Sequence, residues 1–244
     1  MAAHAVSRVA VPAHERLIVA LDVDTRDAAL ALVERIGDAC AFYKIGMELL
    51  TSGDYFAVLE ALAARGKKVF VDLKFFDVPA TVASAVRGLT RYPVTFATVH
   101  GNDAMMRAAA AEKRGIAILA VTALTSLDRR DLDDLGFACD PEALVLSRAK
   151  AALVAGCDGV ISSGLEAAAL RREVDSSLIV VCPGIRPVDN TGDDQKRTVD
   201  VAQAFANGAD YIVMGRPIRQ ASDPRAAAEA VQATIRAAFP QRPL

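Results

Sequence analysis

The sequence predicts an α/β protein, a single (β/α)8 TIM barrel, from its length, its composition and its periodicity. The chain has 244 residues, close to the roughly 250 that one such barrel takes. Hydrophobic residues make up 53% of the chain and aromatic residues 5%, which is typical of Ala-rich helices packed on an aliphatic parallel sheet. From Leu17 onward, short apolar runs alternate eight times with amphipathic segments. This count favours a closed barrel over an open sheet.

The apolar runs are the predicted strands, and we expect helices in the gaps between them. The predicted strands are 17–22, 41–46, 69–74, 96–101, 117–122, 159–163, 178–183 and 211–216. Capping residues mark three helix starts, at Thr25, at Asp140 before a proline and at Asp223 before a proline. No linker divides the chain. We therefore expect residues 1–16 to be an N-terminal lead, whose order the sequence leaves open, and 17–244 to form one catalytic barrel domain.

Charge, cysteine usage and hydropathy exclude several classes of protein. The 28 Lys and Arg residues against 30 Asp and Glu give a net charge of −2, so no overall basic field favours nucleic acid or an anionic membrane. The 4 cysteines form no C-x-x-C pair, which predicts reduced thiols and a cytoplasmic location. The longest strongly apolar stretch, 116–124, is far shorter than the roughly 20 residues that span a bilayer. Of the 3 histidines, His4 and His14 lie in the lead and only His100 belongs to the periodic region, so a multi-histidine metal site is excluded.

The segment Asp72-Leu73-Lys74-Phe75-Phe76-Asp77 carries three charges at the end of an apolar run. Residues two apart in a strand share a face, so Asp72 and Lys74 should point the same way. The proline at 79 should end the strand and leave Asp77 on the following loop. An unpaired buried charge costs on the order of several kcal/mol. The cluster is therefore either a structural ion network or part of a functional site.

Other predicted strands repeat this pattern, with an inward face that is apolar at the start and polar at the end. The polar ends are Asp22, Lys44, Lys74, His100 and Arg216. On the last strand this interpretation assigns Ile212, Met214 and Arg216 to the inner face. Because barrel enzymes bind their substrates at the carboxyl ends of the strands, these residues predict a common pocket. For His100 alone we favour a buried, hydrogen-bonded structural role.

Two later segments have the composition of a phosphate site. Pro183-Gly184-Ile185-Arg186-Pro187 follows the seventh predicted strand, and Met214-Gly215-Arg216-Pro217 ends the eighth. Barrel enzymes frequently hold a phosphate at this position. Glycine lets the backbone approach the anion, and arginine adds a fixed charge with forked donors. Either pair alone could be a turn glycine beside a surface arginine, but together they predict phosphate binding.

At this point the chain resembles the orotidine 5′-phosphate decarboxylase family, over Asp22 to Arg216. The matching blocks are Leu21-Asp22-Val23-Asp24, Tyr43-Lys44-Ile45-Gly46, Asp72-Leu73-Lys74-Phe75-Phe76-Asp77-Val78-Pro79-Ala80-Thr81, Leu124-Thr125-Ser126, Pro183-Gly184-Ile185-Arg186-Pro187 and Met214-Gly215-Arg216. The resemblance implies conversion of orotidine 5′-monophosphate (OMP) to UMP and CO₂, the last step of de novo UMP synthesis. It also implies a homodimer with shared active sites, and neither a cofactor nor a metal.

The resemblance also assigns roles to individual residues. It makes Lys74 the proton donor to C6, with Asp72 and the other subunit's Asp77 holding it charged and Lys44 completing a row of alternating charges. The implied substrate contacts are Asp22 and Lys44 to the ribose, Thr81 from the partner subunit, Thr125 and Ser126 to the pyrimidine, and Arg186, Gln195, Gly215 and Arg216 to the phosphate. Gln195 lies in a polar loop, 189–196, long enough to close over the site.

The chain departs from the family's pattern at two positions and leaves two rival interpretations. Phe76 and Ala80 stand where many relatives are expected to have His and Asn, which puts the geometry of that loop in question. One rival is a metal-dependent phosphosugar barrel, either hexulose-phosphate synthase-like or a pentulose-phosphate epimerase. Lys44 argues against the first of these, because a metal-binding acid is expected there. The other rival is a non-catalytic nucleotide-binding barrel.

Overall fold

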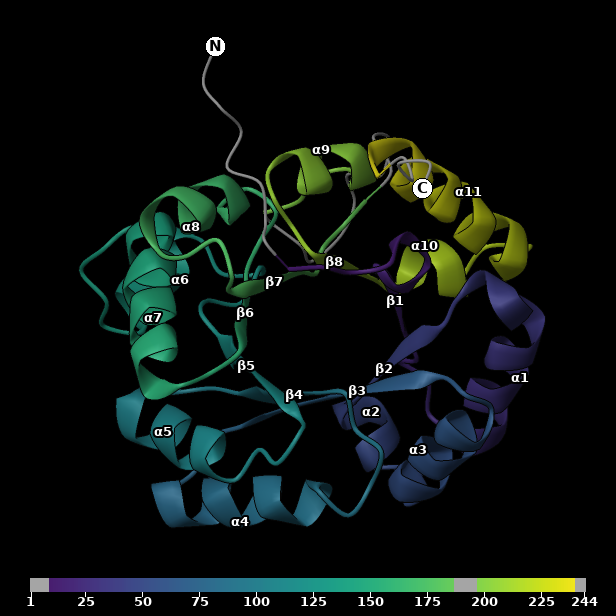
Figure 1. Ribbon diagram of the computed structural model, residues 1–244, viewed down its shortest axis with the longest axis horizontal. Helices are drawn as coiled ribbons and strands as arrows, with labels where there is room; N and C mark the ends of the chain where they lie inside the picture. The colour runs from purple at the N-terminus through teal and green to yellow at the C-terminus, as the bar shows by residue number, and fades with distance from the viewer. Residues whose placement is uncertain (1–8, 187–196, 240–244) are drawn as a thin grey trace.

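The protein is a closed barrel of parallel strands surrounded by helices (Figure 1). The computed structural model describes residues 9–186 and 197–239. Within them the strands pair in sequence order, and β8 closes on β1. The strands are β1 Leu17–Ala20, β2 Phe42–Gly46, β3 Lys68–Phe75, β4 Phe96–Val99, β5 Ala117–Val121, β6 Gly159–Ile161, β7 Ile179–Cys182 and β8 Tyr211–Met214. The predicted (β/α)8 barrel is confirmed.

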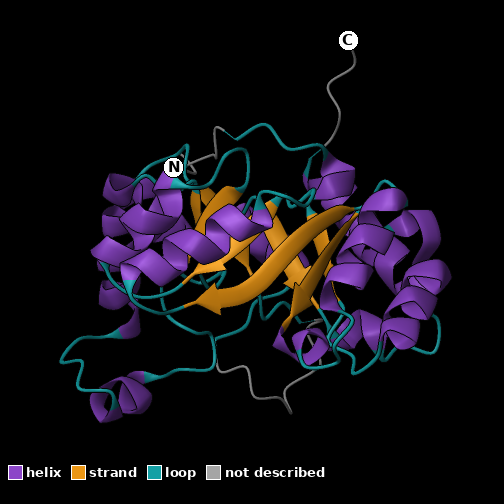
Figure 2. Ribbon diagram, turned by 90° about the horizontal axis from the view of Figure 1, so that it is seen from below, coloured by secondary structure: helices purple, strands orange, loops and turns teal. Residues whose placement is uncertain are grey.

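Helices fill the gaps between the strands and cover the outside of the barrel (Figure 2). They are η1 Ala13–Glu15, α1 Arg26–Ile36, η2 Gly37–Ala39, α2 Met47–Leu50, α3 Tyr55–Ala64, α4 Pro79–Leu89, α5 Asp103–Ala111, α6 Arg129–Asp134, α7 Pro141–Ala155, α8 Ala167–Glu173, α9 Val201–Ala206, α10 Arg216–Arg219 and α11 Pro224–Ala238. Thr25 caps α1 and Asp223 caps α11 through their side-chain oxygens. Asp140 precedes α7 without a side-chain cap.

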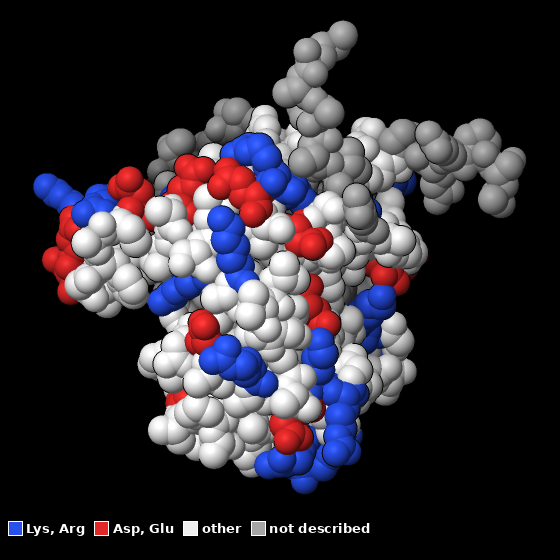
Figure 3. Space-filling model, turned by 60° about the vertical axis from the view of Figure 1, so that its left-hand side comes forward, with Lys and Arg blue, Asp and Glu red and all other residues white. Residues whose placement is uncertain are grey.

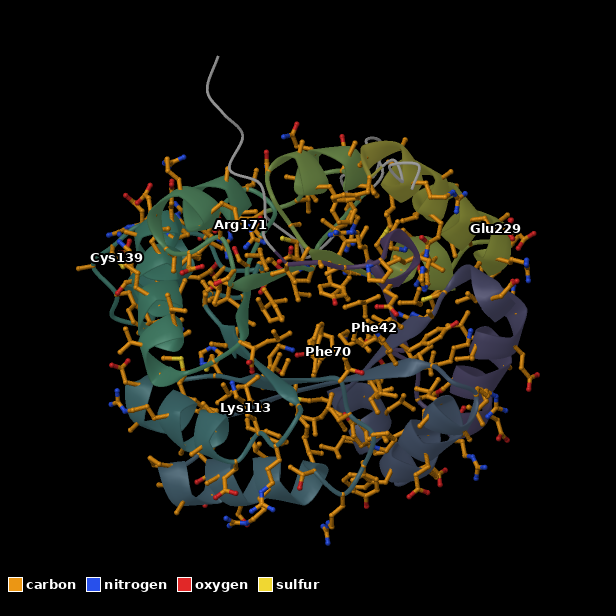
Figure 4. All side chains as sticks on the ribbon, viewed as in Figure 1. Phe42, Phe70, Lys113, Cys139, Arg171 and Glu229 are labelled. Atoms are coloured by element: carbon orange, nitrogen blue, oxygen red, sulfur yellow. The ribbon has the colours of Figure 1, made fainter. Side chains whose placement is uncertain are left out.

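Two apolar cores hold the barrel together. The larger lies between the strands and the helices, and the smaller fills the barrel itself. The inner core consists of Ile18, Ala20, Phe42, Phe70, Phe96, Leu119, Val121, Ile161, Val181, Tyr211 and Val213. Figure 4 shows Phe42 and Phe70 pointing into the barrel, where the two rings pack around Phe96. This packed interior forms the floor on which a site at the strand ends can be built.

The inner face of β8 differs from the prediction. Tyr211 and Val213 belong to the inner core, whereas Ile212 and Met214 pack outward against the helices. All four residues of β8 are apolar and buried, so their pattern alone could not distinguish the two faces. The pairing with β1 decides it, because inward-facing Ile18 is the register partner of Val213.

The amino-terminal end of the barrel contains a fully buried ion pair. Arg171 Nη2 lies 2.6 Å from Asp210 Oδ2, and both side chains have 0% exposure. Asp210 also accepts a hydrogen bond from the Val180 amide, and its carbonyl accepts one from Arg16. These contacts join α8, β7 and the lead to the start of β8.

β1 begins at Leu17, where the sequence places the start of the barrel. The division of the chain into a lead and one barrel domain stays a prediction.

The outer surface carries charges of both signs. Figure 3 shows Lys and Arg side chains interspersed with Asp and Glu on one side of the molecule. Charged pairs at the surface of the molecule include Arg87 with Glu112 at 2.8 Å and Arg225 with Glu229 at 2.8 Å. No helix in the described part of the chain combines the length and the apolar character needed to cross a membrane.

Candidate active site

A cavity of about 280 Å³ opens at the carboxyl ends of the strands. Its floor is apolar and includes Phe70, Val121 and Val213 of the inner core. Most of the residues that the sequence indicates lie around it: Asp22, Lys44, Asp72, Lys74, Thr125, Ser126, Arg186, Gly215 and Arg216. The fold thus brings together segments from six strand ends that are up to 194 residues apart in the chain.

Four charged side chains form a continuous row along one wall of the cavity. Lys44 Nζ lies 2.9 Å from Asp22 Oδ1 and 3.5 Å from Asp72 Oδ2. Lys74 Nζ lies 2.9 Å from the same Asp72 oxygen. The side chains of Lys44 and Asp72 are only 13% and 12% exposed, so little water screens them. The row therefore alternates in charge, from the carboxylate of Asp22 through the ammonium of Lys44 and the carboxylate of Asp72 to the ammonium of Lys74.

The row holds its inner members in their charged forms. Burial alone would raise the pKa of Asp72, but Lys44 and Lys74 outweigh it and lower that pKa below its ordinary value. Burial alone would lower the pKa of Lys44, but the carboxylates of Asp72 and Asp22 together raise it above the ordinary value. Opposite charges at this separation favour ionisation of both partners. At neutral pH the wall presents fixed charges of alternating sign.

Lys74 has an unusual backbone conformation. Its φ is +49°, in the left-handed region that residues with a side chain seldom adopt. The pairing of β3 with β4 shifts register between Val71 and Phe75, as at a bulge that redirects a side chain. The Thr98 hydroxyl accepts a hydrogen bond from the Lys74 amide at 2.9 Å and donates one to Asp72 Oδ1 at 2.9 Å. Thr98 thereby fixes both members of the Asp72–Lys74 pair.

The rest of the polar lining comes from the loops after β5 and β7 and from α10. Thr125 and Ser126 follow β5, Arg186 follows β7, and Arg216 begins α10. A Cβ added at Gly215 would lie 3.5 Å from the Ala20 Cβ and 3.6 Å from Asp22 Oδ2, so the backbone runs close to the charged row there. Arg219, which the sequence motifs do not indicate, also lines the cavity. Its position three residues after Arg216 is the signal that could have found it.

Two of the predicted site residues that the structure describes do not line the cavity. Asp77 and Thr81 are exposed on the loop after β3 and the start of α4, and Asp77 Oδ1 accepts a hydrogen bond from the Val78 amide. Gln195 lies outside the described residues. The roles of all twelve residues stay predictions.

The surroundings of His100, which follows β4, also differ from what the sequence predicts. Phe76 is 66% exposed, and its ring meets the His100 ring edge-on at 5.5 Å. His100 is half-buried, and its pKa is lowered by burial and by nearby Arg148 and Lys74. Within residues 9–186 and 197–239 the His100 ring makes this aromatic contact and no side-chain hydrogen bond, which differs from the hydrogen-bonded role favoured for it.

Metal-ligating side chains do not cluster in the described part of the chain. Among residues 9–186 and 197–239, no three His, Cys, Asp or Glu side chains gather closely enough to hold a metal ion. The acids of the charged row, Asp22 and Asp72, are each paired with lysine ammonium groups instead. The donor set of the cavity therefore favours electrostatic chemistry by lysine and carboxylate side chains.

Fold and cavity together define a (β/α)8-barrel enzyme with a highly charged site at the carboxyl ends of its strands. A model of the Orotidine 5′-phosphate decarboxylase / HUMPS family matches residues 15–231. The chain belongs to this family.

Individual relatives resemble the chain over almost its full length. It is 63% identical over 230 residues to an orotidine 5′-phosphate decarboxylase of Methylococcus capsulatus, covering 94% of this chain and 95% of the relative. It is 59% identical over 239 residues to that of Xanthomonas euvesicatoria, covering 96% and 98%. The crystal structure of orotidine 5′-phosphate decarboxylase from Lactobacillus acidophilus superposes with a TM-score of 0.80 at 34% identity, covering 91% and 99%.

Proposed function

We propose that this protein decarboxylates OMP to UMP and CO₂, the last step of de novo UMP synthesis. Family membership and the names of close relatives support the reaction. The observation that carries the proposal is the charged row, in which Lys74 Nζ lies 2.9 Å from Asp72 Oδ2 at the edge of the cavity. The reaction needs an ammonium group beside a carbon that becomes negative, and this row supplies one.

The reaction breaks the bond between C6 and the carboxylate, and the electron pair stays on C6. We assign Lys74 to stabilise this developing charge and then to transfer a proton from Nζ to C6, which leaves a neutral amine that water reprotonates. Asp72 keeps Lys74 charged and oriented before the bond breaks. Lys44 holds Asp72 ionised in turn, which the lowered pKa of Asp72 supports. Fixed charges of this kind stabilise a transition state without reorganising solvent.

The remaining residues of the cavity bind the non-reacting parts of the substrate in this proposal. Asp22 and Lys44 contact the ribose, Thr125 and Ser126 contact the pyrimidine, and Arg186, Gly215 and Arg216 contact the phosphate, together with Gln195. Their positions along the barrel support this division, because the arginines follow β7 and β8 while the charged row comes from β2, β3 and the loop after β1. Binding energy from the phosphate can then stabilise the transition state at C6.

We further propose a homodimer in which Asp77 and Thr81 complete the partner's site. Both residues are exposed and lie outside their own subunit's cavity. Large apolar side chains are exposed beside them, Phe76 at 66% and Val78 at 61%. Clustered exposed apolar residues are typical of protein interfaces. We also propose a cytoplasmic location, since Cys40, Cys157 and Cys182 are buried as free thiols.

A decarboxylation assay after treatment with a chelator tests the proposed reaction. Purified protein freed of metal should still convert OMP, followed as loss of ultraviolet absorbance, because lysine and carboxylate groups carry the chemistry. An absolute requirement for added metal would contradict the proposal and favour a metal-dependent phosphosugar enzyme. Binding of UMP without any turnover of OMP would indicate a non-catalytic nucleotide-binding barrel.

A further inference from the structure

Arg219 lies at the end of α10, three residues after Arg216. Side chains three apart on a helix lie on the same face, and both arginines line the cavity. Arg186 reaches the same cavity from the loop after β7. The cavity thus has three arginines on the side of β7 and β8, although the sequence motifs indicate only two.

Within the described residues Arg219 has no ionic or hydrogen-bonding partner for its guanidinium group, and its Nε is buried without a hydrogen bond. Two more deeply buried arginines have carboxylate partners. Arg171 contacts Asp210 at 2.6 Å, and Arg197 contacts Glu166 at 2.6 Å. Arg219 is half-buried in the cavity wall, where partial withdrawal of a charge from water without a partner is unfavourable. The unpaired guanidinium of Arg219 is explained if its partner is a ligand.

The surroundings of Arg219 indicate an anionic ligand, because Arg186 and Arg216 line the same cavity. Asp22 lies beside the backbone of Gly215, where an added Cβ would be 3.6 Å from Asp22 Oδ2. Its carboxylate would repel an anion bound at Gly215 and Arg216. A further cation on the same short helix offsets this repulsion. A guanidinium group also offers several planar N–H donors, which match the oxygens of a phosphate.

We propose that Arg219 is a third phosphate-binding arginine of this cavity and contacts the 5′-phosphate of the nucleotide directly. The inference rests on the proposed function insofar as the ligand is a nucleoside 5′-monophosphate. It predicts that the charge of Arg219, rather than its bulk, contributes to nucleotide affinity.

Calorimetric titration with UMP tests this inference in the full-length protein. Arg219→Gln keeps most of the side-chain length and removes the charge, and should weaken UMP binding about 10- to 100-fold, as for loss of a charge-assisted hydrogen bond. Arg219→Lys keeps a charge without the planar fork and should lose less. Arg236→Ala removes an exposed arginine of α11 and should bind UMP as the unaltered protein does. Melting curves without ligand check that each variant is folded.

Two results would overturn the inference. One is UMP affinity in Arg219→Gln within twofold of the unaltered protein. The other is an equal loss in Arg219→Gln and Arg219→Lys, which would mean that packing rather than charge matters. If Arg219→Gln does not fold, UMP affinity in Arg219→Lys within twofold of the unaltered protein would contradict a contact through the planar guanidinium group, and a lower affinity with an unchanged melting curve would support it. Failure of the unaltered protein to convert OMP would refute the proposed reaction while the UMP titrations still decide the role of Arg219.

Discussion

At the scale of single residues, Thr98 supports the Asp72–Lys74 pair through one hydroxyl group. It is 1% exposed, and it hydrogen-bonds both the Lys74 amide and the Asp72 carboxylate. The left-handed backbone of Lys74 costs on the order of 1–3 kcal/mol, so it persists only where neighbouring contacts hold it. This dependence makes Thr98 a positioning residue for a charge that it does not itself carry.

Thr98→Val preserves the shape of the side chain and removes both hydrogen bonds. We expect the free energy of unfolding to fall by about 1–3 kcal/mol, measured by urea denaturation, and the turnover of OMP to fall with it. Thr98 is one cause of the lowered pKa of Asp72. The stability that ionised Asp72 contributes is present above its ordinary pKa and is lost as pH falls through the folded-state pKa. Without the Thr98 hydrogen bond the folded-state pKa of Asp72 lies closer to its ordinary value, so the loss should be smaller in the variant and complete at a higher pH.

Thr95→Val is the matched control for this substitution. Thr95 precedes β4 at the other end of the strand and has no side-chain hydrogen bond within the described residues. Its free energy of unfolding should stay within about 0.5 kcal/mol of the unaltered protein. Equal effects of the two substitutions would show that Thr98 contributes only through its local packing.

At the scale of elements, Arg197 connects three loops around the cavity. Its guanidinium contacts Glu166 after β6 at 2.6 Å and donates to the Leu124 carbonyl after β5 at 3.0 Å. Its amide donates to the Thr125 carbonyl, and its own carbonyl accepts from Ser163. Arg197 therefore fixes the loop that carries Thr125 without lining the cavity itself.

Glu166→Gln leaves the buried guanidinium of Arg197 without its counter-charge. We expect the free energy of unfolding to fall by about 3 kcal/mol, as is typical when one partner of a buried pair is removed. In urea denaturation Glu229→Gln serves as control, because Glu229 pairs with Arg225 on the exposed face of α11 and should change stability by under about 1 kcal/mol. A loss at Glu166 no larger than at Glu229 would show that the buried pair adds nothing.

At the scale of the whole molecule, the sequence predicts the barrel well because each strand and helix carries its own periodic signal. Asp72 and Lys74 follow from the two-residue period of a strand, and Arg186 and Arg216 follow from their glycine neighbours. The inward face of β8 did not follow, because four consecutive apolar residues fit either face until closure on β1 sets the register. The bulge at Lys74 and the orientation of Arg219 depend on contacts with distant segments. Tertiary packing alone determines features of this kind.

Assembly is the property that a single chain cannot display, and a mixing experiment addresses it. Lys74→Ala and Asp77→Ala should each remove most activity, since one deletes the proton donor and the other an acid of the partner's site. If the sites are shared, half of the dimers in an equal mixture contain one subunit of each variant. One of the two sites in such a dimer then has both Lys74 and Asp77, and the other has neither. Activity should then recover to about one quarter of the unaltered level after exchange of subunits. If Asp77 acts within its own subunit, no site in the mixture is complete, and activity should stay at the level of the separate variants.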